Sequence, residues 1–105
     1  MSNQKTNTFN ALIAESFWFS QSENAKLKYI GNWKAELQGV SISTSIWSVT
    51  SGDATITTES LDGNTASCFI SGQPGENIII NKITTDDGQT DERRLLIEIR
   101  NNETV

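Results

Sequence analysis

The last third of the chain alternates apolar and polar residues with the two-residue period of a β-strand. In residues 90–100, Leu95, Ile97 and Ile99 fall on one face, and charged side chains fall on the other. A shift of one residue would bury those charges, so the register of this strand is well specified. Residues 78–84 form a second apolar run, and the Asp-Asp-Gly-Gln sequence between the two runs favours a turn. The pattern therefore predicts an antiparallel hairpin.

Two features of this hairpin depart from simple alternation. Leu96 lies among the charged residues, so we expect it on an exposed or partner-facing surface. Ile78, Ile79 and Ile80 run together and give no alternation. Either that strand is buried on both faces, or one of its faces meets something outside the domain, and the sequence leaves both alternatives open.

Strand-like segments also occupy residues 27–33, 40–49, 54–58 and 65–71. Turn residues separate them at intervals of roughly ten residues, which is typical of a β-sandwich with about seven strands. We therefore predict an all-β, antiparallel sandwich over residues 25–101, followed by a C-terminal tail at residues 102–105. We expect no helix longer than a short N-terminal one.

Residues 1–24 differ from the rest of the chain in their pattern of apolar residues and are predicted to form an N-terminal arm. Four of its apolar residues lie three or four positions apart and would share one face of a helix. The arm is either a short helix or extended segment that packs on the chain's own sandwich, or an arm that docks on a partner, since aromatic residues are common interface anchors. The candidate partner-binding residues are Phe9, Leu12, Ile13, Phe17, Trp18 and Phe19.

Length and charge narrow the classes of function. A chain of 105 residues has the size of a single domain with one modest core. Its net charge of −5 and its scattered basic residues argue against nucleic acid, which is bound through clustered cations. No apolar stretch approaches the roughly 20 residues that span a bilayer, so no membrane contact is expected. No basic segment leads into an apolar run at the N-terminus, so we expect no signal peptide and synthesis in a reducing cytoplasm.

The residues that usually carry catalysis are missing or badly placed. The chain has no histidine, which removes the commonest general base and zinc ligand. Cys68 lies in the middle of a predicted strand and is expected to be a buried structural thiol. The acidic turn at residues 86–89 fails as a calcium loop, because Ile83 and Arg94 occupy ligand positions. Residues 91–94 are then expected to be a solvated ion-pair patch, and we predict no catalytic, cofactor-binding or metal site.

Several segments resemble a group of small immunoglobulin-like virion proteins of tailed bacteriophages, the fibre–tail adaptors. The matching segments are residues 27–33 with Leu37, 40–49, 71–75 and 83–93, of which the last, ITTDDGQTDER, is the most specific. The resemblance covers about residues 25–100, and the family tends to start near Ala25, so residues 1–24 look like an added arm. It implies an immunoglobulin-like sandwich and a non-enzymatic, structural role in a phage particle.

The role that the resemblance implies is an adaptor linking tail and fibre in the virion. Its implied partners are other tail, fibre or capsid subunits, with the chain itself a homo-oligomer. One alternative is a capsid decoration or head–tail connector protein. Another is a host-surface or carbohydrate-binding module with Trp18, Trp33 and Trp47 as candidates for stacking on sugars, although strand alternation places Trp33 and Trp47 inward.

Overall fold

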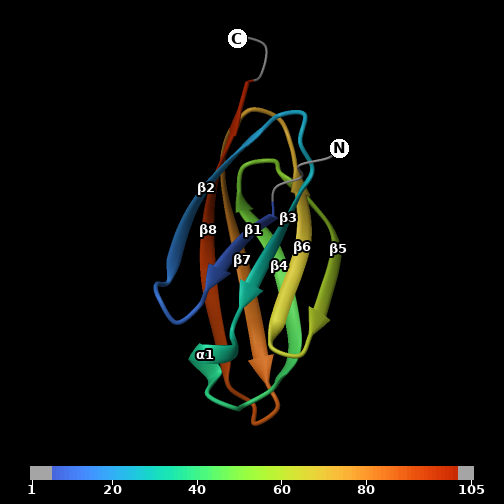
Figure 1. Ribbon diagram of the computed structural model, residues 1–105. Coiled ribbons are helices and arrows are strands. Elements are labelled where there is room, and N and C mark those ends of the chain that lie inside the picture. Colours follow the sequence, from blue (N-terminus) through green and yellow to red (C-terminus); the bar gives the residue numbers. More distant parts are fainter. Residues whose placement is uncertain (1–5, 102–105) are drawn as a thin grey trace.

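The computed structural model describes residues 6–101, which form a β-sandwich with one short helix (Figure 1). The predicted all-β class is confirmed. In chain order the elements are β1 (Thr6–Asn10), β2 (Ser16–Ser22), β3 (Leu27–Asn32), α1 (Lys34–Leu37), β4 (Ile42–Ser51), β5 (Thr55–Asp62), β6 (Thr65–Ser71), β7 (Gly75–Thr85) and β8 (Thr90–Arg100).

Two four-stranded sheets make up the sandwich, with strand orders β1-β3-β6-β5 and β2-β8-β7-β4. If β2 is set aside, the remaining order is that of a seven-stranded immunoglobulin sandwich, as predicted. The structure differs from a purely antiparallel sandwich at two edges, because β1 runs parallel to β3 and β2 runs parallel to β8. Both parallel strands come from the N-terminal segment, so each sheet is mixed.

The C-terminal hairpin forms as the alternation predicts. β7 and β8 pair antiparallel, with Ile79 opposite Leu95, and both side chains are fully buried. At the turn, the Thr85 amide donates to the Gln89 carbonyl oxygen over 2.8 Å, and Gly88 takes the positive φ of 88°. Glycine adopts that conformation without the strain that a Cβ would bring. The hydrogen bond and the glycine conformation of this turn therefore account for its sequence.

The N-terminal segment is extended and belongs to both sheets. β1 lies on the edge of one sheet and β2 on the edge of the other, so the chain crosses the sandwich at the corner between them (Figure 1). Phe9 from β1 and Phe17 from β2 meet between the layers, with ring centroids 4.9 Å apart. Phe9 also lies over Gly31, where a Cβ would stand 2.5 Å from the Phe9 Cζ atom. The helical spacing does not produce a helix, because burying both rings requires two strands on opposite layers.

Facing side chains of the two sheets form the core. Its aromatic part centres on Phe9, which packs edge-on against Trp33 and Trp47 at 6.5 and 6.3 Å. The inward prediction for these two tryptophans is confirmed, since both are buried. The other buried apolar residues are Ala11, Tyr29, Ile42, Ala66, Cys68, Ile70, Ile79, Ile83, Leu95, Ile97 and Ile99.

A four-residue helix follows β3 and closes one end of the sandwich. α1 begins after Trp33, whose indole Nε1 donates to Asn81 Oδ1 over 2.9 Å. Asn81 is fully buried, and its Nδ2 donates to Ser45 Oγ over 3.0 Å. These two hydrogen bonds connect β4 and β7 to the start of α1. Along residues 6–101, no helix is long and apolar enough to cross a membrane.

Candidate partner-binding surface

The structure divides the predicted partner-binding residues into two groups. Phe9 is buried in the core, and Phe17 and Phe19 are partly buried against it. Three residues remain outside, and they are Leu12, Ile13 and Trp18, with exposed fractions of 55%, 75% and 78%. The alternation of β2 explains the division, because Phe17, Phe19 and Gln21 point between the sheets while Trp18 points away from them.

Leu12 and Ile13 form the tip of the corner between β1 and β2. Asn10 shapes this corner, because its side-chain Oδ1 accepts from the Leu12 amide and its carbonyl oxygen accepts from the Ile13 amide, each over 3.0 Å. Such an Asx turn stops the strand and directs the next side chains outward. On the inner side, the Ala11 amide donates to the Asn32 carbonyl oxygen over 2.9 Å. The two exposed side chains are therefore presented on a fixed turn.

The side chain of Arg93 contacts this corner from β8. Its side chain is only 6% exposed, and its Nε donates to the Ala11 carbonyl oxygen over 2.9 Å. The guanidinium carbon lies 4.8 Å from the centroid of the Trp33 ring. Nη1 lies 3.0 Å from Asp91 Oδ1, and Nη2 lies 3.5 Å from Glu36 Oε2. The expectation of a solvated ion-pair patch is wrong for Arg93, because the corner, α1 and β8 enclose it.

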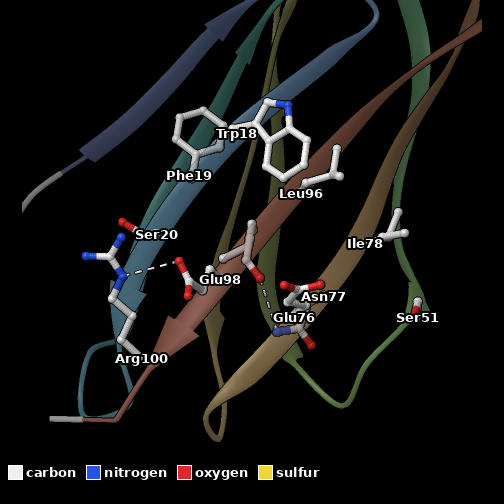
Figure 2. A pocket seen from close by; sticks show the side chains of 11 residues that line it. Trp18, Phe19, Ser20, Ser51, Glu76, Asn77, Ile78, Leu96, Glu98 and Arg100 are labelled. Carbon is white, nitrogen blue, oxygen red and sulfur yellow. Dashed lines mark hydrogen bonds and ion pairs between the residues drawn. The ribbon is translucent and has the colours of Figure 1, made fainter.

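Trp18 belongs to an apolar row on the outer face of the β2-β8-β7-β4 sheet. Strand pairing sets Leu96 opposite Trp18 on one side and opposite Ile78 on the other. Leu96 and Ile78 are half-buried. Figure 2 shows the Trp18 ring lying toward Leu96 at the edge of an open groove of about 580 Å³. We call Trp18, Leu96 and Ile78 the apolar row.

Charged side chains flank the apolar row along β8. Arg94 lies before Leu96 and Glu98 after it, and all three point to the outer face. Glu98 stands directly opposite Glu76 of β7 in the strand register. Glu98 Oε1 also lies 3.3 Å from Arg100 Nε, in a pair that is well exposed on both sides (Figure 2). One side of the row is therefore basic and the other is acidic.

The sequence placed Trp18 among the candidate partner-binding residues and Leu96 on an exposed or partner-facing surface, but it did not show that the two lie side by side with Ile78. The signals for these two residues were the break in alternation at Leu96 and the unalternated run that begins at Ile78. In the structure Ile79 is buried while Ile78 and Ile80 are half-buried on the outer face, so this strand is not fully buried on both faces.

Within residues 6–101, neither surface contains the cysteine or a cluster of metal ligands. Cys68 lies in the core, and burial raises the pKa of its thiol well above the ordinary value, which disfavours a nucleophilic thiolate. Within the part of the chain that the structure describes, no three or more His, Cys, Asp or Glu residues are grouped so that they could hold a metal ion. The arrangement of side chains suits binding through apolar and charged contacts.

Comparison with known proteins gives a family match and two similar folds. A family model described as "Podophage GP4 fiber-tail adaptor protein gp77" matches residues 21–98. No curated protein matches the chain. The cysteine protease inhibitor EhICP2 of Entamoeba histolytica superposes with a TM-score of 0.60 at 7% identity, over 95% of this chain and 100% of that one. The PKD domain from KIAA 1837 protein gives a TM-score of 0.53 at 10% identity, over 99% and 86%. At these identities, the two structures support the fold alone.

Proposed function

The chain belongs to the podophage fibre–tail adaptor family, and on that premise we propose that it is a structural protein of a phage particle that links the tail to a fibre. The family match carries this proposal. It spans the end of β2 through most of β8, which is nearly the whole sandwich rather than one short motif.

The surface of the sandwich suits a linking role, because a linker needs more than one contact area. The corner presents Leu12 and Ile13, and the outer sheet face presents the apolar row. Apolar side chains held on a rigid scaffold lose little conformational entropy on binding. We propose that the corner contacts another virion protein, with Leu12 and Ile13 as its apolar anchors.

Burial of two tryptophans weakens the carbohydrate-binding alternative. A sugar platform uses exposed aromatic faces, but Trp33 and Trp47 are enclosed in the core. Trp18 is then the one exposed tryptophan of the chain's three, all of which the structure describes. The adaptor role is therefore favoured over a sugar-binding role, and location in the particle distinguishes it from a decoration or connector role.

Purified particles provide the test. We expect mass spectrometry to detect the chain in intact virions and cryo-electron microscopy to place its density where the tail meets a fibre. Density on the capsid or at the head–tail junction would contradict the adaptor role in favour of the decoration or connector alternative. Absence of the chain from virions would refute a structural role altogether.

The corner is tested by a variant supplied to particles that lack the wild-type chain. The double variant Leu12→Ser/Ile13→Ser should fold normally, because both side chains are largely exposed, but its incorporation should fall strongly. A matched control is Ile46→Ser, which also removes an exposed apolar side chain (58% exposed) but from β4. Equal incorporation of both variants would contradict the assignment of the corner.

A further inference from the structure

The outer face of the β2-β8-β7-β4 sheet combines an apolar row with charges of opposite sign on its two sides. Trp18, Leu96 and Ile78 lie on three adjacent strands at the same level of the sheet. A row across three strands spaced about 4.8 Å apart is a continuous patch rather than a set of isolated apolar side chains. Contiguous exposed apolar patches mark interaction sites.

Arg94 and Glu98 are placed symmetrically about this row. Each lies two residues from Leu96 on the same face of β8, which corresponds to about 6.7 Å on either side of the row. Arg94 is exposed and forms no ion pair with any residue from 6 to 101. Its charge therefore remains available to a partner.

The acidic side of the row carries a local repulsion. Glu76 and Glu98 face each other directly across β7 and β8, and like charges in that position destabilise a sheet. Arg100 relieves Glu98 only partly, because that pair is exposed to solvent. A cation supplied from outside the chain would relieve the pair of carboxylates, which gives the acidic side a preference for a basic partner.

We propose that this face binds a second copy of the chain, related to the first by a two-fold axis that runs along the apolar row. The axis sets each residue of the row against its own counterpart and reverses the strand direction. Because Arg94 and Glu98 are equidistant from Leu96, Arg94 of each copy then lies over Glu98 of the other, while Glu76 lies over Ile80 on the neighbouring strand. The same face therefore supplies both the basic and the acidic side of the contact, and such self-complementarity is what an interface with two-fold symmetry requires.

The charges favour this axis over a two-fold axis that runs along the strands. A two-fold axis along the strands would place Arg94 over Arg94 and Glu98 over Glu98, which electrostatic repulsion disfavours. Packed sheets lie about 10 Å apart, a gap that an arginine and a glutamate can bridge from opposite sides. The proposed dimer uses only the surface of this chain, so it does not depend on the adaptor role.

Charge reversal tests the pairing in the purified full chain. Analytical ultracentrifugation of the wild type should show a concentration-dependent dimer that weakens as salt is added. R94E and E98R should each weaken dimerisation by about tenfold or more, because each places like charges against each other twice. K26E, which reverses an exposed charge outside this sheet, should dimerise like the wild type.

Mixing the two single variants is the decisive step. The R94E chain carries glutamate at both positions and the E98R chain carries arginine at both, so each contact between the two chains joins opposite charges. The equimolar mixture should therefore form a heterodimer with near wild-type affinity. The double variant R94E/E98R should recover a homodimer for the same reason. A different binding mode would show no such rescue, and circular dichroism of each variant establishes that it remains folded.

Trp18→Ser tests the apolar row separately from the charges. The side chain is 78% exposed, so the variant should fold with little loss of stability while its dimerisation weakens. A wild-type chain that stays monomeric at millimolar concentration would overturn the proposal, as would single reversals that dimerise like the wild type or a mixture that stays monomeric. In each of these cases the face would be open to a different partner, and the particle test of the adaptor role would be unaffected.

Discussion

Replacing Arg93 with methionine should destabilise the sandwich far more than its place in a charged segment suggests. The guanidinium is enclosed by the corner, α1 and the Trp33 ring, and it donates to the Ala11 carbonyl oxygen over 2.9 Å. Methionine keeps most of the apolar stem and removes the donors and the charge. Arg93→Met therefore isolates what the guanidinium contributes.

The expected loss follows from the contacts that disappear. Leaving the carbonyl of the buried Ala11 without a donor costs about 1–3 kcal/mol. Loss of the cation–π contact with Trp33 adds about 0.5–2 kcal/mol. The ion pair with Asp91 contributes at most about 1 kcal/mol, because that carboxylate is 43% exposed. The free energy of unfolding should fall by about 2–4 kcal/mol, which for a domain of this size lowers Tm by roughly 10–25 °C.

Urea unfolding followed by circular dichroism measures the loss, and Arg100→Met provides the matched control. Arg100 is on the same strand and is also paired with a carboxylate, but its side chain is 65% exposed, so its replacement should change stability by less than about 0.5 kcal/mol. Arg93→Lys keeps the charge without the planar fork and should fall between the two. Hydrogen exchange adds a local readout, because the amides of Ala11 and Arg94, bonded to Asn32 and Glu15 at this corner, should lose protection first. Equal free energies of unfolding for Arg93→Met and Arg100→Met would refute the reasoning.

Three further predictions concern the core. Asn81→Leu should lower the free energy of unfolding by about 2–3 kcal/mol in denaturant titrations, because it leaves the buried Trp33 Nε1 without its acceptor; an unchanged midpoint would contradict this. Gly31→Ala should cost about 1–3 kcal/mol through its clash with the Phe9 ring, and Phe9→Leu in the same chain should recover part of that loss in a double-mutant cycle. Burial raises the pKa of Tyr29 from 10.0 to about 12, so the unfolded chain releases this proton first, and stability that is present below pH 10 should decline by up to about 3 kcal/mol as pH rises through 12. Tyr29→Phe should flatten that decline, and an unchanged slope in this variant would assign it to other groups.

Local periodicity was enough to identify the elements that bury one face each. The β7–β8 hairpin could be predicted because alternation fixes which side of each strand is apolar, and a shift in register would bury charge. The inward direction of Trp33 and Trp47 followed from the same rule. Periodicity failed in the N-terminal segment, where Phe9 and Phe17 have helical spacing but reach the core from two different strands.

The sequence by itself determined the fold class, the inward faces of the strands and the family to which the chain belongs. All three depend on residues close together in the chain, whose spacing is visible without a structure. Only the tertiary structure decided that β2 pairs with β8, which completes the apolar row of Trp18, Leu96 and Ile78. It also decided that Arg93 is enclosed while Arg94 is exposed. These outcomes depend on which strands become neighbours, and a pattern along one strand carries no information about the strand beside it.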